Sequence, residues 1–323
     1  MKIKQCIVLA ITASFSFFTL AETSITYISS CSDLSKINDN PDGEYQLTAN
    51  VSCGQNFESL GYFKGELDGK GFTISDLNLT GTGNVGLFTQ IRGAKIRNLT
   101  LRNITVAPTN RSLSIGVLAG RAYGSHLTNV EIENSDITAF EKVTHGVGML
   151  AGTIEDTIVE MVKVSNSTLN VAHTNSLGML LGQAKYSELS NLVHRNNILT
   201  ISNDEQEFVG GIVGNVYGSS LDNIQSSNNL ISAQILERGN VGLLTGQLTK
   251  GSTLVNAEIH RDMLDVPVNA NLVKKGIAAG YILKPSETAA TLSNIQTYSV
   301  DDDLHWYNSS HDTDIVTEKI IKN

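Results

Sequence analysis

Short runs of aliphatic residues recur along this chain, separated by Gly, Asn and Ser. Each run is five or six residues long and rich in Val, Ile and Leu, which is typical of β-strands bounded by turns. The period of 3.6 residues that marks an amphipathic helix is not found in the sequence. The pattern therefore predicts an all-β chain.

The aliphatic runs belong to an internal repeat of 30 to 34 residues. The copies begin with the pattern apolar-Gly-x-x-x-Gly, except that the first has Gln90 in place of its second Gly and the last starts with Lys275. The first glycines are Gly86, Gly116, Gly148, Gly178, Gly210, Gly242 and Gly276. A column of asparagines follows, interrupted once by Met161, and comprises Asn98, Asn129, Asn191, Asn223, Asn256 and Asn294. Aliphatic residues stand two positions before and one position after this column in every copy. A second asparagine column, five residues further on, comprises Asn103, Asn134, Asn166, Asn196 and Asn228.

A period near 32 residues predicts one coil of a parallel β-helix, a solenoid in which each short strand pairs with its equivalent in the next coil. Aligned aliphatic positions would fill the interior. Aligned asparagines would tolerate left-handed bends and form amide ladders between coils. The glycine columns would allow the backbone to approach closely where the coil turns. We expect seven to eight coils.

Three other architectures fit the repeat less well. Gly-x-x-x-Gly marks membrane helix pairs only within a long apolar stretch, and the runs here are too short. A leucine-rich repeat matches the spacing of Leu127, Val130 and Ile132, but Asn134 then falls one position early and the period is too long. A helical solenoid would need amphipathic helices.

The boxes VGLL-x-G and VGML-x-G, each followed by Leu-x-Asn, resemble the GLUG repeat of bacterial surface adhesins and filamentous-haemagglutinin-like proteins. That repeat also occurs in non-catalytic portions of some immunoglobulin-A-cleaving metallopeptidases. The resemblance covers residues 65–300 and implies a right-handed β-helix in an exported bacterial protein. The His-Glu-x-x-His motif is absent from the sequence, so the resemblance does not extend to peptidase activity.

The first 21 residues have the features of a signal peptide. A basic start precedes an apolar run that ends at Thr19-Leu20-Ala21, and we expect cleavage after Ala21. The run is too short to span a bilayer. Export leaves Cys31 and Cys53, which we expect to form a disulfide in an oxidising compartment. The alternative, lipid attachment at Cys31, is less consistent with the polar residues that separate it from the apolar run.

The formal net charge of −9 argues against nucleic acid or an anionic membrane as a partner. Gly contributes 28 residues and Pro only four, which suits a repeated architecture with many tight turns. We expect no cofactor, and no membrane span in the mature chain. Its localisation is expected to be secreted or at the cell surface, with the periplasm as a further option.

Candidate catalytic or binding chemistry is sparse. Residues two and four positions after the asparagine column should point outward, and among them Glu131, Glu133 and Lys163 are weak candidates for a small binding site. Charges along this face alternate in sign between copies, as on a solvated surface. His194 and Ser226 fall in an otherwise aliphatic column, where we expect a core histidine with one hydrogen bond, or a local outward turn, rather than a ligand.

The C-terminal segment holds the weak metal candidates Asp301, Asp303 and His305. Their spacing matches no known ligand pattern. The alternative, which we favour, is that Leu304, Trp306 and Tyr307 cap the open end of the coil.

We therefore expect a signal peptide (1–21), an N-terminal cap with a disulfide (22–72), the repeats (73–300) and a C-terminal cap (301–323). The expected function is a non-enzymatic adhesin or binding scaffold for a glycan or a host or envelope protein. A carbohydrate-active β-helix enzyme and a structural envelope component are the alternatives, so whether the chain is an enzyme stays open, with the balance against it.

Overall fold

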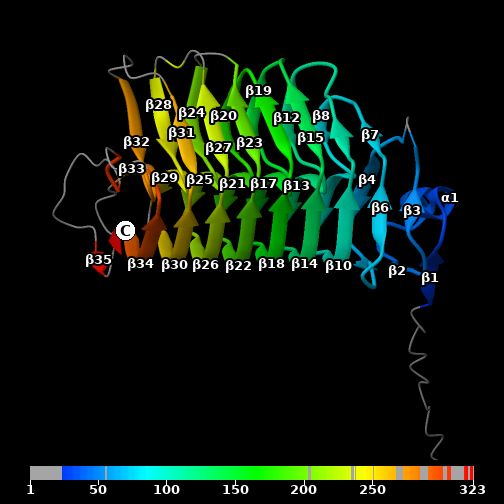
Figure 1. Ribbon diagram of the computed structural model, residues 1–323. Coiled ribbons are helices and arrows are strands. Elements are labelled where there is room, and N and C mark those ends of the chain that lie inside the picture. The colour runs from blue at the N-terminus through cyan, green and yellow to red at the C-terminus, as the bar shows by residue number, and fades with distance from the viewer. Residues whose placement is uncertain are drawn as a thin grey trace, which may run out of the picture.

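The computed structural model describes residues 24–54, 57–202, 205–233, 236, 238–249, 251–266, 272–283, 290–300, 304–306, 316–318 and 321–322. The expected signal peptide, Asp301, Asp303 and Tyr307 lie outside these residues. The described chain forms a parallel β-solenoid of about seven turns, which confirms the predicted fold class (Figure 1).

One coil illustrates the whole. Strands β14 (His126–Glu133), β15 (Asp136–Ala139), β16 (Val143–Val147) and β17 (Ala151–Glu155) follow one another around the axis. The next strand, β18 (Ile158–Ser165), then lies parallel to β14, with Val162 beside Val130. Repeating this path stacks the strands into four sheets, called A, C, D and B here in the order in which a coil visits them.

Sheet A contains the longest strands and holds both ends of the solenoid. Its path runs through β1 (Ile25–Ile28), β2 (Glu44–Leu47), β5 (Glu66–Asp68), β10 (Lys95–Arg102), β14, β18, β22 (Glu188–Arg195), β26 (Ser220–Ser227), β30 (Thr253–His260), β34 (Thr291–Tyr298) and β35 (Val316–Glu318). Three further strands pair beside this path, namely β3 (Val51–Ser52), β6 (Thr73–Ser75) and β36 (Ile321–Lys322).

The other three sheets contribute one short strand per coil. Sheet C contains β7 (Asn78–Leu79), β11 (Thr105–Val106), β15, β19 (Thr168–Val171), β23 (Ile198–Ile201), β27 (Leu230–Ala233) and β31 (Met263–Asp265). Sheet D contains β8 (Gly83–Val85), β12 (Ser112–Ile115), β16, β20 (Thr174–Gly178), β24 (Glu205–Gly210), β28 (Arg238–Gly242) and β32 (Leu272–Gly276). Sheet B contains β4 (Leu60–Phe63), β9 (Phe88–Arg92), β13 (Ala119–Tyr123), β17, β21 (Leu181–Lys185), β25 (Val213–Tyr217), β29 (Thr245–Thr249) and β33 (Ala279–Leu283).

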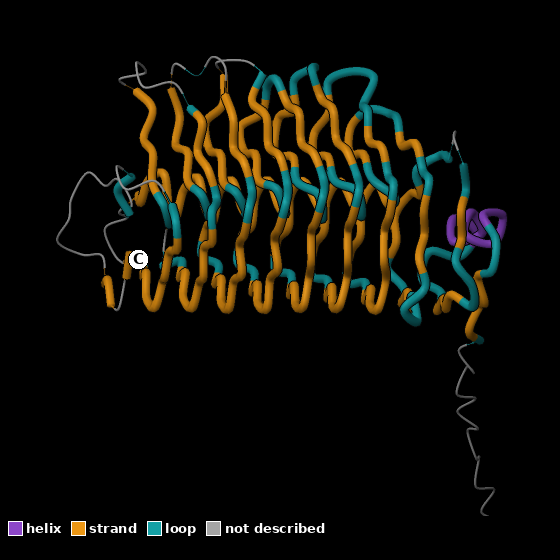
Figure 2. The backbone as a smooth tube through the Cα atoms, viewed as in Figure 1, coloured by secondary structure: helices purple, strands orange, loops and turns teal. Residues whose placement is uncertain are grey.

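The long strands of sheet A are bent in the middle, and Figure 2 shows the bends in register along the axis. The bend residue in β14 is Asn129, whose φ of 53° is left-handed. Asparagine tolerates this conformation better than other residues with a Cβ. The remaining members of both asparagine columns have the same conformation, as do Met161, Arg261 and Ser299 where the columns lose Asn. The asparagine columns therefore mark two corners of the coil.

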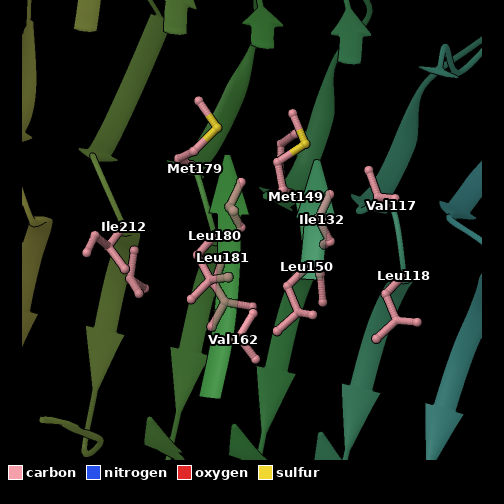
Figure 3. Packing of buried hydrophobic residues seen from close by; sticks show 14 of the residues in the cluster. Val117, Leu118, Ile132, Met149, Leu150, Val162, Met179, Leu180, Leu181 and Ile212 are labelled. Atoms are coloured by element: carbon pink, nitrogen blue, oxygen red, sulfur yellow. The ribbon is translucent and has the colours of Figure 1, made fainter. Parts of the chain in front are cut away.

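The interior is a stack of aliphatic side chains. Leu127, Val130 and Ile132 of β14 are buried, and their equivalents in the neighbouring coils lie directly above and below them. Figure 3 shows the same arrangement for Met149 and Met179, which occupy equivalent turns of successive coils. Each coil alone would expose this surface, so stacking is what stabilises it.

The glycine columns are required by close backbone contacts between sheets D and B. A Cβ built on Gly178 would lie 2.2 Å from the carbonyl oxygen of Leu181. A Cβ on Gly182 would lie 2.4 Å from the backbone nitrogen of Val147, in the preceding coil. These distances are far inside van der Waals contact, which confirms the close approach that the repeated Gly-x-x-x-Gly predicts.

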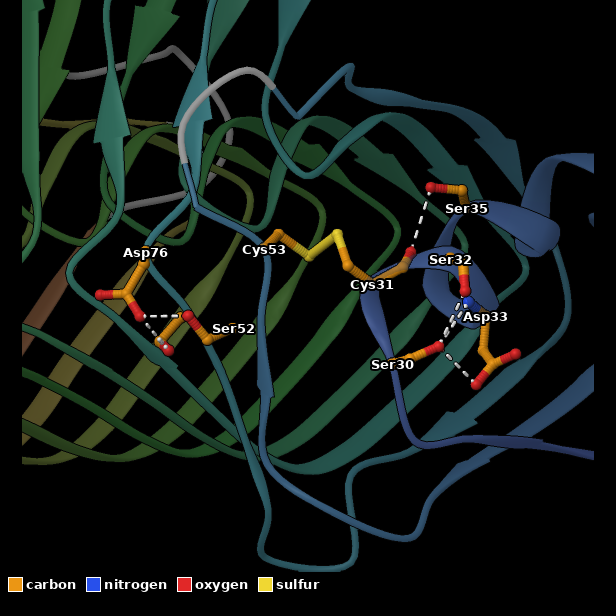
Figure 4. Close-up of a disulfide and its surroundings, with 9 residues drawn as sticks. Ser30, Cys31, Ser32, Asp33, Ser35, Ser52, Cys53 and Asp76 are labelled. Atoms are coloured by element: carbon orange, nitrogen blue, oxygen red, sulfur yellow. Dashed lines mark hydrogen bonds between the residues drawn. A yellow bond between two sulfur atoms is a disulfide. The ribbon is translucent and has the colours of Figure 1, made fainter.

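Helix α1 (Cys31–Ser35) and the 3-10 helix η1 (Lys36–Asp39) lie at the N-terminal end. Ser30 caps α1 by accepting a hydrogen bond from the backbone of Asp33 at 3.2 Å. A disulfide joins Cys31 to Cys53, as predicted (Figure 4). Strands β1, β2 and β5 pair in register with one another, and β5 pairs with β10 of sheet A, so the first stacked strands lie within residues 22–72.

At the C-terminal end, Leu304 and Trp306 pack against the hydrophobic core. The backbone carbonyls of His305 and Trp306 accept hydrogen bonds from Ile277 and Ala278 at 2.8 and 2.9 Å. Both contacts extend the stack by part of a coil. Within the described residues, no helix has the length and apolar character needed to cross a membrane.

Candidate binding groove

A groove runs along sheet A, parallel to the solenoid axis, at the bend of the long strands. Two hollows make it up, of about 450 and 300 Å³, and they meet at Asn191. We call this surface the asparagine groove. Its lining comprises Asn129, Val130, Glu131, Met161, Val162, Lys163, Asn191, Val193, Asp222, Asn223, Ile224, Gln225, Asn256, Ala257, Glu258, Asn294 and Gln296.

Hydrogen bonds link the asparagine amides along the groove. The Nδ2 of Asn129 donates to Oδ1 of Asn98 at 2.9 Å, and that of Asn223 donates to Asn191 at 2.6 Å. The Nδ2 of Asn294 donates to Asn256 at 2.6 Å. These residues are exposed or half-buried, so each amide keeps further donor and acceptor capacity on its open side.

The asparagine row is not uniform. Met161 interrupts it between Asn129 and Asn191, and 46% of its side chain is exposed. The Nδ2 of Asn256 donates to Oδ1 of Asp222 at 2.7 Å, and Asp222 is the residue before the column member Asn223. The groove therefore has an apolar stretch around Met161 and a polar stretch from Asn191 onward.

The candidate residues Glu131, Glu133 and Lys163 lie on the outer face of sheet A but do not form one cluster. Lys163 is ion-paired with Glu131 of the preceding coil. Glu133 is ion-paired with Arg102, one coil in the other direction. Only Glu131 and Lys163 line the groove. Carboxylates held in this way resemble the alternating charges of a solvated face rather than a general acid and base.

The C-terminal metal candidates remain a prediction. The His305 side chain is exposed, and its two carboxylate partners lie outside the described residues. In the part of the chain that the structure describes, no three His, Cys, Asp or Glu side chains are grouped so that they could hold a metal ion.

Two buried polar columns were not found by the sequence reasoning. The first lies at the corner where the chain passes from sheet B to sheet A, and it comprises Ser125, Thr157, Ser187, Ser219 and Ser252. Each hydroxyl accepts the backbone N–H of the equivalent residue one coil earlier, at 3.0 to 3.4 Å. The second comprises Ser135, Ser167, Asn197, Asn229 and Asp262, with equivalent hydrogen bonds of 2.8 to 3.2 Å. Both columns satisfy backbone donors that the corners turn away from their usual partners.

The second column ends in a buried polar cluster. The Asp262 carboxylate accepts a hydrogen bond from the Ser226 hydroxyl, and its Oδ1 accepts one from Asn229 Nδ2 at 3.0 Å. The Ser226 Oγ lies 3.5 Å from Nδ1 of His194. His194 is thus the core histidine that the sequence predicts, and its Nε2 is buried with no hydrogen-bond partner.

Burial dominates the electrostatics of this cluster. It raises the pKa of Asp262 to about 6, although hydrogen bonds from Ser226 and Asn229 oppose the shift. Burial lowers the pKa of His194 to about 3, so the imidazole is neutral at physiological pH. His194, Ser226 and Asp262 are at most 3% exposed, and the serine stands between the other two. The arrangement lacks the open nucleophile and the oriented base that a hydrolase needs.

Comparisons with known proteins find relatives of this architecture. A protein-family profile, the N-terminal region of the M26 IgA1-specific metallo-endopeptidases, matches residues 14–134. Halomucin from Haloquadratum walsbyi is 32% identical over 46% of this chain, which spans 2% of halomucin's length. A candidate immunoglobulin A1 protease from Bacteroides ovatus has a TM-score of 0.48 at 13% identity, covering 92% of this chain and 83% of that one.

An IgA1 protease structure is similar over 94% of this chain and 22% of its own length, with a TM-score of 0.52 at 18% identity. At that identity the likeness concerns the fold alone. The chain thus spans a small fraction of the longer proteins that it matches. These comparisons support the β-solenoid fold, and they supply no catalytic residues.

Proposed function

We propose that this chain is an exported, non-enzymatic binding scaffold of the GLUG-repeat type, which presents its outer faces to a glycan or a protein. The observation that carries the proposal is the asparagine groove, which crosses successive coils and offers an amide at nearly every one. A surface of this length fits an extended ligand better than a small substrate.

Two other observations support the proposal. The disulfide between Cys31 and Cys53 is expected of a protein that folds in an oxidising compartment. The charged candidates Glu131, Glu133 and Lys163 are occupied by ion pairs with neighbouring coils. Adhesin-like surface presentation is also consistent with the GLUG-type boxes and with the likeness to halomucin.

The test combines localisation and binding. Cell fractionation should recover the processed chain outside the cytoplasm, beginning near Glu22. The purified protein, residues 22–323, should bind at least one member of a glycan array or one protein from envelope or host extracts. Retention in the cytoplasm would contradict export. Depolymerisation of a polysaccharide, abolished by Glu131→Gln together with Glu133→Gln, would establish an enzyme instead.

A further inference from the structure

We infer that the ligand of the asparagine groove is a neutral, extended glycan that lies parallel to the solenoid axis, with about one sugar unit per coil. The inference rests on the proposed function and names the ligand class and the site. Three features of the groove carry it: the spacing of the amides, the charge of the lining and the apolar stretch at Met161.

The spacing favours a sugar chain over a peptide. Equivalent residues of paired strands are about 4.8 Å apart, so the amides recur at that interval along the groove. An extended peptide presents the same face every two residues, an interval of about 6.7 Å. That interval exceeds the spacing between amides by about 2 Å, so the peptide would lose register after one coil. That error exceeds what a hydrogen bond tolerates. A chain of pyranose units linked through equatorial oxygens advances by nearly one strand spacing per unit and turns over at each unit, so every second unit presents the same hydroxyls to every second amide nearly in register.

The amides retain the groups that such hydroxyls need. In the hydrogen bond from Asn223 to Asn191, each side chain uses one donor or one acceptor site. The second N–H of each amide and a lone pair on its oxygen are left for the groove side. A hydroxyl can both donate and accept, so vicinal hydroxyls match an amide at two points.

The charge of the lining excludes polyanionic glycans. Asp222 and Glu258 line the larger hollow, and among the described residues that line it there is no Lys or Arg. In the smaller hollow, Lys163 is neutralised by Glu131. A uronate or sulfated chain would place its charges against these carboxylates. The hydroxyl groups of a neutral sugar would instead donate hydrogen bonds to these carboxylates.

The apolar stretch offers contact for the C–H face of a sugar ring. Met161 is 46% exposed with a left-handed φ of 54°, a conformation that is strained for a methionine. Val193 lies beside it in the lining of the same hollow. An asparagine at this position would relieve the strain and continue the row, whereas the methionine gives the groove an apolar surface that the C–H face of a sugar ring can contact.

The experiment compares two substitutions in the same coil. Asn191 lies in the groove, whereas Asn196 lies in the second column and lines none of the described hollows. Both residues have a φ of 56°. Each is hydrogen-bonded to the equivalent asparagine of a neighbouring coil, Asn191 to Asn223 and Asn196 to Asn166. Replacement by glycine removes the amide and preserves the left-handed bend. Asn191→Gly is therefore the test variant and Asn196→Gly its matched control.

Binding is measured by calorimetry on the full mature chain. The probes are β-1,4-linked trimers and hexamers of glucose, mannose and N-acetylglucosamine, a galacturonate hexamer, and an uncharged extended peptide. We expect at least one neutral hexamer to bind, more tightly than its trimer and than the galacturonate. Asn191→Gly should weaken that binding about tenfold, the effect of losing one or two hydrogen bonds, and Asn196→Gly should leave it unchanged.

The outcomes separate this inference from the proposed function. Equal effects of the two substitutions, or preference for galacturonate or the peptide, would overturn the inference and leave the binding scaffold standing. Binding of an envelope or host protein without any neutral glycan would do the same. Failure to bind any of the probes, the array glycans or the extracts would overturn both.

Discussion

Asp262 offers a direct test of how burial governs this fold. The carboxylate is 3% exposed at the end of the second buried column, and its pKa is raised from 3.8 to about 6. A folded-state pKa above the unfolded value means that the native protein binds this proton more tightly. The resulting stabilisation is present below pH 3.8 and is lost as the pH rises through 6. A shift of about two units corresponds to ~3 kcal/mol.

The substitution Asp262→Asn removes that charge and keeps most of the hydrogen bonds. The asparagine Oδ1 can still accept from the backbone and Nδ2 of Asn229, now at 2.8 and 3.0 Å. Its Nδ2 can donate to Ser226 Oγ, which is then free to donate to His194 Nδ1. We expect the variant to be more stable than the parent at pH 7.5, by about 1–3 kcal/mol after incomplete hydrogen-bond adjustment.

His194 makes the pH profile diagnostic. Its pKa is lowered from 6.5 to about 3, so its contribution to the stability of the fold is present above pH 6.5 and is lost as the pH falls through 3. Between pH 4 and 6 this slope opposes that of Asp262, and the two nearly cancel in the parent. Asp262→Asn should expose the histidine slope, a rise of about 1.4 kcal/mol per pH unit relative to the parent.

Urea denaturation followed by circular dichroism, at half-unit steps from pH 4 to 7.5, measures these differences. His194→Val is the matched control, because Val164 already occupies the same column one coil earlier. In His194→Val the Asp262 contribution should remain alone, so the free energy of unfolding should fall relative to the parent as the pH rises from 4 to 6. A variant Asp262→Asn that is less stable than the parent at pH 7.5, with an unchanged slope, would refute the argument that burial of the charge dominates.

Three further predictions concern other columns. Replacing Asn191 or Asn223 with Leu should lower the free energy of unfolding by about 1–3 kcal/mol, because the left-handed bend and the amide hydrogen bond are both disfavoured; unchanged melting of both variants would mean that these columns do not stabilise the fold. Gly178→Ala should destabilise by more than a typical surface change, since its Cβ would overlap the Leu181 carbonyl. Gly124→Ala is the control that tests only backbone strain, because its added Cβ would lie 4.0 Å from the backbone nitrogen of Gly93, an ordinary van der Waals distance. Replacing Cys31 and Cys53 with Ser should cost about 3 kcal/mol for a loop of this size, and a chemical melt that matches the parent under oxidising conditions would contradict it.

The sequence predicts those parts of the fold that need one particular residue type. Only glycine fits at Gly178, and asparagine is the best residue with a Cβ at a left-handed bend such as Asn129, so both recur as visible columns. The charge pairing of Glu131 with Lys163 also follows from the period, because the two positions are one repeat apart.

The buried polar columns escape such reasoning because their requirement is looser. Any side chain with an oxygen at the right distance can accept the backbone N–H, so Ser135, Asn197 and Asp262 are equivalent in role although the residue type changes along the column. The sequence does not predict the groove for a related reason. Its hollow depends on how far the strand bends at Asn191 and on which side chains flank the bend, and a one-dimensional pattern does not contain either quantity.

The identity of the last residue in the second column follows from what the column must do. The Ser167 hydroxyl accepts a hydrogen bond from the backbone N–H of the preceding column member, Ser135, and donates its own proton to the Ser165 carbonyl. Asn229 likewise accepts from Asn197 and donates onward to Asp262. The side chain of Val300, at the equivalent position in the next coil, has no acceptor, so a donor group at position 262 would find none there. An aspartate accepts without donating, so it closes the column at the cost of a buried charge, and that charge is what the pH experiment measures.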